Sequence, residues 1–124
     1  VYVETASCGQ DAINTVNSKP NYFDIVFMDN IMPDMSGLEV SKVLRSDCLY
    51  TNLLIGVTGN VMDDDLYQFI ISGADIAFAK PMKLQIVEKL LDHCRQFGTF
   101  SVSQDRKTGV MSSRLQSLTR ITGR

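Results

Sequence analysis

The sequence lacks several features that would define other classes of protein. It has no apolar run of about 18 residues, so it encodes no membrane-spanning helix. Its N-terminus lacks the basic start and apolar stretch of a secretory signal. Only three cysteines are present, and the spacing of Cys8, Cys48 and Cys94 fits neither a metal-binding pair nor a disulfide framework. We therefore expect buried, reduced thiols in a cytoplasmic protein.

The net charge is small, but the charged residues are unevenly distributed. The net charge of −2 indicates neither a nucleic-acid nor a membrane partner. Residues 1–97 carry 7 basic and 13 acidic side chains, whereas residues 98–124 carry 5 basic side chains and one acidic one. The second segment is also rich in Ser and Thr and poor in large apolar residues. We predict one folded domain over residues 1–97 and a flexible basic tail or linker over 98–124, with a short helix at 110–118 as the alternative.

The first 97 residues alternate between strand-like and helix-like blocks. Short apolar or alternating segments predict strands, and helical spacing of apolar residues predicts a helix after each one. Two pairs, Ser7 with Gln10 and Ser36 with Glu39, have the spacing of a helix capping box. Strands that alternate with helices predict an α/β fold with a parallel sheet covered on both faces. The predicted strands are residues 1–5, 25–28, 53–57 and 76–79.

Three polar residues directly follow buried strands, and parallel strands bring such residues to one edge of the sheet. These residues are Asp29, Thr58 and Lys80. A carboxylate can attack a phosphoryl group to give an acyl phosphate, and this chemistry needs mainly positioning and charge neutralisation. The combination therefore predicts a phospho-accepting site, although each residue alone would more often be a turn residue.

The surrounding motifs resemble those of response-regulator receiver domains. The segment from Asp29 to Gly37, DNIMPDMSG, resembles the D-x-x-M-P-x-M-[DS]-G signature of that family. Val57-Thr58-Gly59 and the segment from Gly73 to Pro81 resemble two further motifs of the family. The resemblance runs from residue 1 to about residue 97.

The resemblance implies a flavodoxin-like, doubly wound fold and a role in a two-component phosphorelay. Asp29 would accept a phosphoryl group from a histidine kinase or a histidine phosphotransfer protein. Mg²⁺ would be bound by Asp29 and by the backbone carbonyl of Ile31. Thr58 and Lys80 would respond to the phosphoryl group, and the Lys80-Pro81 bond would be cis. The domain would be a switch with at most slow autodephosphorylation rather than a dedicated enzyme, and a receiver dimer is a further option.

The sequence departs from the family in two ways, and its single histidine needs a separate interpretation. Residues 1–5 align with the second strand, so the first strand, the first helix and an acidic pair that binds Mg²⁺ are missing; because residue 1 is Val, we expect them upstream. Ala77 stands where the family often has an aromatic switch residue, and Phe78 should point to the opposite side. His93 lacks the pattern of a phosphorylated histidine, and we expect it to be solvated.

Three other readings compete with a phospho-accepting receiver. An enzyme of the haloacid-dehalogenase type would need a second acid at position 31, which is Ile31. A pseudo-receiver, acting only as a protein-interaction module, stays open because of the missing acidic pair. A DNA-binding regulator is not indicated by the tail, whose basic residues form no helix-turn-helix pattern. We favour a receiver that ends a hybrid histidine kinase, because no output domain follows the tail.

Overall fold

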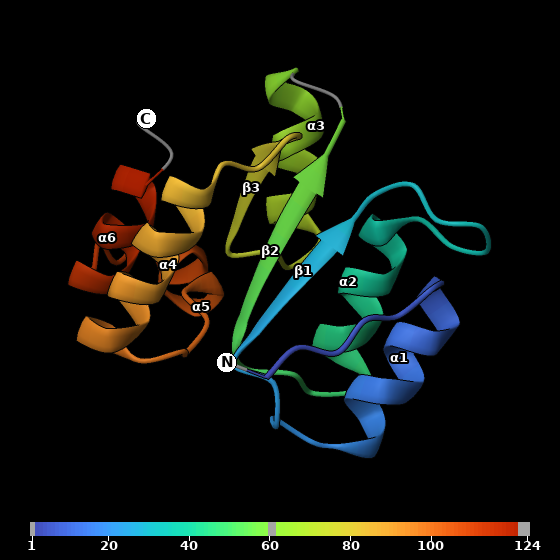
Figure 1. The fold of residues 1–124 in the computed structure, drawn as a ribbon. Helices are drawn as coiled ribbons and strands as arrows, with labels where there is room; N and C mark the ends of the chain where they lie inside the picture. The colour runs from blue at the N-terminus through green and yellow to red at the C-terminus, as the bar shows by residue number, and fades with distance from the viewer. Residues whose placement is uncertain (1, 60–61, 122–124) are drawn as a thin grey trace.

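The computed structural model describes residues 2–59 and 62–121. Strands and helices alternate along the chain, followed by two further helices (Figure 1). The strands are β1 (Ile25–Asp29), β2 (Leu53–Thr58) and β3 (Ile76–Ala79). The helices are α1 (Gly9–Ser18), α2 (Gly37–Ser46), α3 (Asp63–Ile71), α4 (Leu84–Phe97), α5 (Ser103–Thr108) and α6 (Ser113–Ile121).

The three strands described form one parallel sheet in the order β1-β2-β3. Asp29 pairs with Val57, and Thr58 pairs with Ala79. This register keeps the carboxyl ends of all three strands level at one edge, as the alternation of strands and helices predicts.

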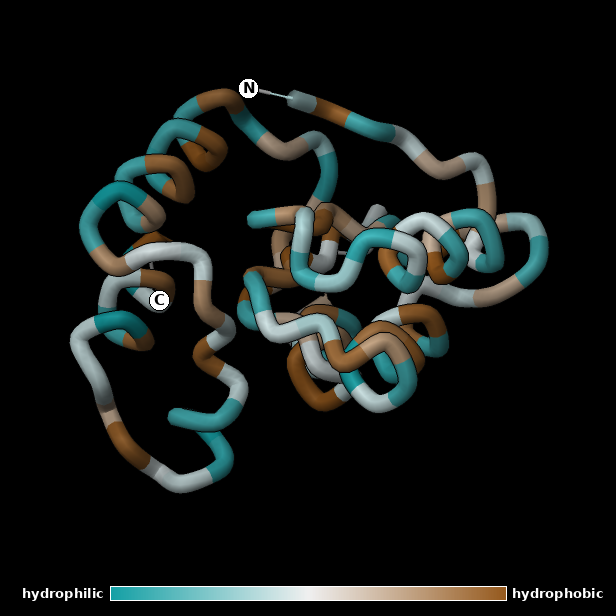
Figure 2. The backbone as a smooth tube through the Cα atoms, turned by 90° about the horizontal axis from the view of Figure 1, so that it is seen from below, coloured by the Kyte–Doolittle hydropathy of each residue, from teal (hydrophilic) through white to brown (hydrophobic). Residues whose placement is uncertain are grey.

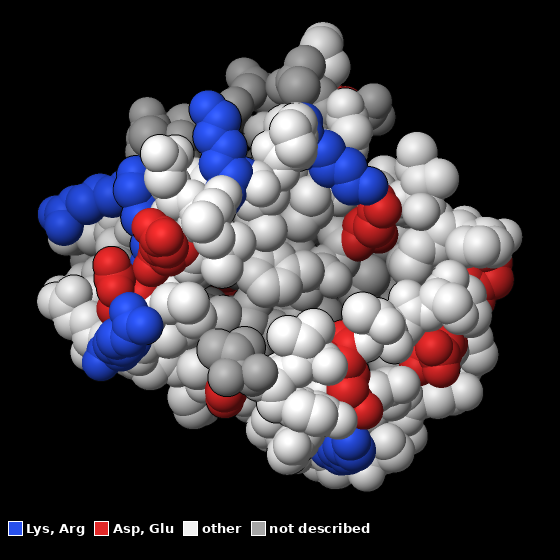
Figure 3. All heavy atoms as spheres, viewed as in Figure 1, with Lys and Arg blue, Asp and Glu red and all other residues white. Residues whose placement is uncertain are grey.

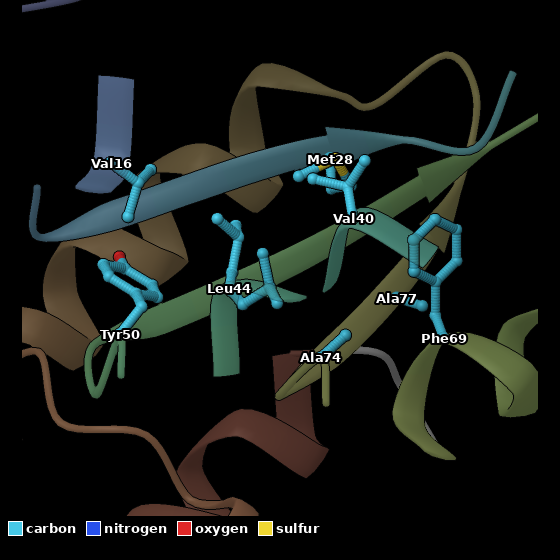
Figure 4. Packing of buried hydrophobic residues seen from close by; sticks show 9 residues of the cluster. Val16, Met28, Val40, Leu44, Tyr50, Phe69, Ala74 and Ala77 are labelled. Carbon is cyan, nitrogen blue, oxygen red and sulfur yellow. The ribbon is translucent and has the colours of Figure 1, made fainter. Parts of the chain in front are cut away.

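Each face of the sheet is covered by its own hydrophobic cluster. Along β2, Leu54 faces α1, α2 and α3, whereas its neighbours Leu53 and Ile55 face α4 and α6. Because side chains alternate across a strand, a continuous apolar run fills both clusters at once. Figure 4 shows the first cluster, in which Phe69 from α3 packs toward the sheet. Along the helices, hydrophobic and hydrophilic residues alternate, as amphipathic elements require (Figure 2).

The N-terminal segment corrects the first predicted strand. Residues 2–6 form no strand, and Val1 lies outside the described residues. Tyr2 and Val3 are exposed, and Glu4 forms an ion pair with Lys19 at the end of α1. The resemblance to receiver domains implies a neighbouring strand that this sequence does not contain, and among the described residues this segment pairs with no strand. Phe27 of β1 is 45% exposed. In the view of Figure 1, uncharged side chains fill the middle of the surface, and most charged side chains lie around them (Figure 3).

The C-terminal segment corrects the prediction of a flexible tail. Over residues 98–121 the chain forms α5 and α6, and Val102, Leu115, Leu118 and Ile121 are buried in the second cluster. The large apolar residues are few, but α6 places three of them on one face against α4 and the sheet. The helix expected as an alternative at 110–118 is present as Ser113–Ile121. The family boundary at residue 97 stays a prediction.

The same packing corrects the prediction for His93. Its side chain is buried rather than solvated, and its Nδ1 atom lies 2.8 Å from the Ser117 hydroxyl of α6. The reason is that α6 covers this position on α4, and α6 was not expected to pack there. The cysteines also differ from expectation: Cys8, Cys48 and Cys94 are free, as predicted, but only half-buried. No helix among the described residues is long and apolar enough to span a membrane.

Candidate functional site

The structure brings the three predicted residues to the same edge of the sheet. Asp29 ends β1, Thr58 ends β2, and Lys80 directly follows β3. Because the strands are parallel and adjacent, these positions lie side by side at the carboxyl edge. The Lys80-Pro81 peptide bond is cis, as predicted.

Asp29 and Lys80 form a direct ion pair at this edge. The Lys80 Nζ atom lies 2.6 Å from Asp29 Oδ2, and the Ile31 N–H donates to Asp29 Oδ1 at 3.3 Å. Burial by itself raises the pKa of Asp29, but the hydrogen bonds from Lys80 and the backbone more than offset it, so the pKa lies below its usual value. The Asp29 side chain is 41% exposed, and the Lys80 side chain is 46% exposed. Asp29 is therefore an ionised carboxylate that solvent and partners can reach.

Thr58 is held differently from the other two residues. It is buried, with 2% of its surface exposed, at the end of the central strand. Its main-chain oxygen accepts a hydrogen bond from the Lys80 N–H at 2.7 Å. This hydrogen bond ties the position of Lys80 to the end of β2, which lies between β1 and β3 in the sheet.

Gly37 fixes how α2 begins against the site. A Cβ atom at this position would lie 2.1 Å from the carbonyl oxygen of Asp29, so any other residue would displace one of the two segments. The Gly37 N–H donates to the main-chain oxygen of Asn30 at 2.9 Å. The Ser36 hydroxyl accepts from the Glu39 N–H, which confirms Ser36 as the N-cap of α2 and one of the two bonds of the predicted capping box. The sequence marked Gly37 only as the last residue of a motif; its packing role required the structure.

The metal ligands expected in this chain are oxygen atoms, the type that Mg²⁺ prefers. They are the Asp29 carboxylate and the carbonyl of Ile31, a residue that is 83% exposed. Next to them, Asn30 Oδ1 is buried without a hydrogen-bond partner among the described residues. Within the same part of the chain, no three His, Cys, Asp or Glu side chains gather to hold a metal. The residues present therefore fit a magnesium site in type but supply only part of its ligands.

Ala77 and Phe78 face opposite sides of β3, as the sequence predicts. Ala77 is buried in the first hydrophobic cluster, and Phe78 is buried in the second, on the other face of β3. No aromatic ring therefore stands at residue 77, and the ring of Phe78 lies on the other face of the strand.

Several known proteins resemble this chain in sequence. The chain is 33% identical over 97 residues to two-component system protein A of Emericella nidulans and 34% identical over 88 residues to the sensor histidine kinase RcsC of Escherichia coli. These alignments cover 78% and 71% of the chain but only 14% and 9% of the two relatives, so the chain spans a small part of their length.

A solved structure and a family model also match this chain. The receiver domain of the Saccharomyces cerevisiae response regulator Ssk1, solved in complex with the histidine phosphotransfer protein Ypd1, matches with a TM-score of 0.65 at 23% identity. That match covers 75% of this chain and 72% of the solved one, and it supports the predicted flavodoxin-like fold. The family model for the response regulator receiver domain matches residues 1–92, which contain all three strand-end residues. Since that match covers most of the chain, the protein belongs to the response regulator receiver domain family.

Proposed function

We propose that this domain accepts a phosphoryl group on Asp29 within a two-component phosphorelay. A carboxylate oxygen of Asp29 would attack the phosphorus of a phosphohistidine on a partner. The phosphorus–nitrogen bond would break, and the imidazole would leave with the electron pair and take up a proton. The product would be an aspartyl phosphate, whose formation shifts the domain between two conformations.

The observation that carries this proposal is the state of Asp29 at the carboxyl edge. Its carboxylate is ionised, solvent-accessible and 2.6 Å from the Lys80 ammonium group. In such a site the lysine can move from the carboxylate to the added phosphoryl oxygens and neutralise part of their charge. An ion pair that is only structural would gain little at this level of exposure.

Thr58 and Lys80 would act after phosphoryl transfer. The Thr58 hydroxyl would donate a hydrogen bond to a phosphoryl oxygen, and the shared backbone hydrogen bond would couple this change to Lys80. Asp29 and the Ile31 carbonyl would hold Mg²⁺, which would neutralise phosphoryl charge when bound. Acidic ligands beyond those in this chain would complete that site.

The partner proposed is a histidine kinase or a histidine phosphotransfer protein in the cytoplasm. Support comes from the relatives, which include a sensor histidine kinase, and from the solved complex of a similar receiver with a phosphotransfer protein. We infer a phosphorylation-controlled switch over residues 1–97, with the following helices as a packed extension. Whether the parent protein is a hybrid kinase stays a prediction.

The test is phosphoryl incorporation from acetyl phosphate with Mg²⁺, measured by intact mass. It is run on this chain and, in parallel, on the protein in its natural full-length context. The variants are Asp29→Asn and a matched control, Asp92→Asn, whose carboxylate also has an ion pair at 2.6 Å but lies on α4. One phosphoryl group that is lost only in Asp29→Asn would support the proposal.

The second candidate is a pseudo-receiver that binds partners without phosphorylation. It is favoured by the absence of three gathered metal-binding side chains in the described part of the chain. A folded full-length protein that incorporates no phosphoryl group with Mg²⁺ would establish this second candidate and contradict the first.

A further inference from the structure

A wide groove lies at the end of the sheet opposite to Asp29. It runs between the C-terminal ends of α2 and α3 on one side and the segment from Phe100 to α6 on the other. Thr51 and Gly73, which precede β2 and β3, form part of its floor. The six residues of β2 separate the groove from the phospho-accepting edge by roughly 20 Å. The groove exists because the C-terminal segment packs against the domain.

The size of the groove favours an occupant larger than an ion or a metabolite. Its volume is about 1290 Å³, and it is open to solvent along its length. Pockets for small molecules usually measure about 300–1,000 Å³ and enclose most of the ligand. An open groove of this size is suited instead to a segment of polypeptide.

Basic side chains dominate the charge of the groove. Lys42 of α2 and Lys107 of α5 are exposed and have no ion-pair partner among the described residues. Arg106 donates from Nη2 to the neutral main-chain oxygen of Asp75, and its Nη1 atom is buried with no acceptor in the described part of the chain. Lys42 and Lys107 are therefore not neutralised by the described part of the chain, whereas Arg106 is attracted by the nearby Asp75 carboxylate.

The other charges of the groove form pairs. Arg45 is paired with the buried Asp75 at 2.8 Å, and Arg114 is paired with Asp105 at 3.2 Å. Asp105 is the only acidic residue among the described residues that line the groove. The field in the groove is thus positive, and it complements a ligand that carries carboxylates.

Apolar side chains occupy the same groove. Large apolar residues that stay more than half exposed gather here from both walls: Tyr67, Ile71, Phe100, Val110 and Met111. Such a group of exposed apolar residues beside polar ones marks a protein-binding surface rather than ordinary solvent-facing chain. Nucleic acid is a poorer fit, because it would require a longer series of cations along its phosphates.

We propose that this groove, which we call the α2–α5 groove, binds an acidic peptide segment of a partner protein through apolar anchor residues. Lys42 and Lys107 pair with carboxylates of the peptide at the rim, and the exposed apolar residues receive the anchors. The site is separate from Asp29 and does not depend on its phosphorylation. One wall of the groove lies within the matched residues 1–92, and the other wall, formed by α5 and α6, follows them.

The test is selection of random displayed peptides of about 12 residues, roughly three helical turns, on the immobilised chain. The most enriched peptide is then synthesised with a fluorescent label, and its binding is measured by anisotropy. The groove variant is Lys42→Glu/Lys107→Glu, with Met111→Ser as a second variant that removes an anchor contact without changing charge. The matched control is Lys83→Glu/Lys89→Glu, which changes the same number of exposed lysines outside the groove. Circular dichroism confirms that each variant is folded.

The proposal expects enriched peptides that combine acidic and apolar residues. Their affinity should fall by about tenfold or more in Lys42→Glu/Lys107→Glu and stay within about twofold in the control. No enrichment, enrichment of basic or uncharged peptides, or equal loss in both double variants would overturn the proposal. Self-association of the chain that disappears in Lys42→Glu/Lys107→Glu would also overturn it, because a second copy would then occupy the groove.

Discussion

The Asp75 carboxylate accepts four hydrogen bonds from the described part of the chain. Its side chain is fully buried before β3. One oxygen accepts from Arg45 Nη2 and from the Leu54 N–H, both at 2.8 Å. The other oxygen accepts from the Ser101 hydroxyl at 2.6 Å and from the Val102 N–H at 2.7 Å. One carboxylate thus joins α2, β2 and the start of the C-terminal segment.

Replacing this carboxylate by an amide, Asp75→Asn, should destabilise the protein strongly. The amide keeps one acceptor oxygen but presents an NH₂ group to donors that then have no acceptor, and each buried unsatisfied group costs about 1–3 kcal/mol. The change also leaves the Arg45 guanidinium, 16% exposed, without its counter-charge. Removing one partner of a buried ion pair typically costs about 3–5 kcal/mol. We expect a loss in this range, a large share of the roughly 5–15 kcal/mol that stabilises an ordinary domain.

The assay is urea unfolding followed by far-UV circular dichroism. The control is Asp92→Asn, whose partner Arg95 is 2.6 Å away but whose side chain is 73% exposed, so a loss of at most about 1 kcal/mol is expected. In the double variant Arg45→Met/Asp75→Asn the loss should be smaller than the sum of the single losses, because the two groups interact directly. A loss in Asp75→Asn no larger than in Asp92→Asn would refute the reasoning.

Three further predictions test the site and the packing. Gly37→Ala should lower the free energy of unfolding by about 1–3 kcal/mol and reduce phosphoryl incorporation at Asp29, because the new Cβ atom would meet the Asp29 carbonyl oxygen. Urea unfolding measures the first effect and intact mass the second, and wild-type values in both would contradict the prediction. Leu118→Ala should cost about 2–5 kcal/mol in urea unfolding, since Leu118 is fully buried; a negligible loss would mean that α6 is not packed. Burial lowers the pKa of His93, so the folded protein binds its proton less readily than the unfolded chain. Neutral His93 therefore contributes to the free energy of unfolding fully above the unfolded pKa of about 6.5, and this contribution is lost as the pH falls below that value. His93→Gln should remove this loss of stability at low pH. Parallel stability profiles of variant and wild type between about pH 7.5 and 5.5 would contradict the prediction.

The sheet and the residues at its carboxyl edge could be predicted because local sequence specifies them. A buried strand of a parallel sheet is a short apolar run, and the runs at 25–28, 53–57 and 76–79 differ from the observed strands by at most one residue at the carboxyl end. Asp29, Thr58 and Lys80 then follow from chain order alone, because parallel strands place their ends at one edge.

Elements that depend on distant residues could not be predicted in the same way. The capping box at Ser7 is not used: α1 begins at Gly9, and the Asp34 carboxylate accepts its N–H at 2.8 Å and that of Gln10 at 2.9 Å. The N-terminal strand fails because it needs a neighbouring strand that this sequence does not contain. In both cases the decisive partner is absent from the local pattern.

The C-terminal segment shows where a composition argument is misleading. Few large apolar residues indicated a flexible tail, but order depends on how much apolar area a segment can bury and not on the number of its apolar residues. Leu115, Leu118 and Ile121 are spaced to share one helical face, and nearly all of their surface is buried. The spacing was visible in the sequence; the surface of α4 and the sheet that receives it was not.

The two ends of the sheet consequently depend on different interactions, and this makes their roles separable. At the carboxyl edge, Asp29 and Lys80 form an exposed ion pair that contributes little to stability, so Asp29→Asn can abolish phosphorylation in a protein that remains folded. At the opposite end, Asp75 is buried and structural, and the α2–α5 groove depends on the segment that it anchors. Loss of phosphorylation with intact peptide binding would identify two independent sites. Peptide binding that changes on phosphorylation would instead require the sheet to couple them, with equal effects in both directions.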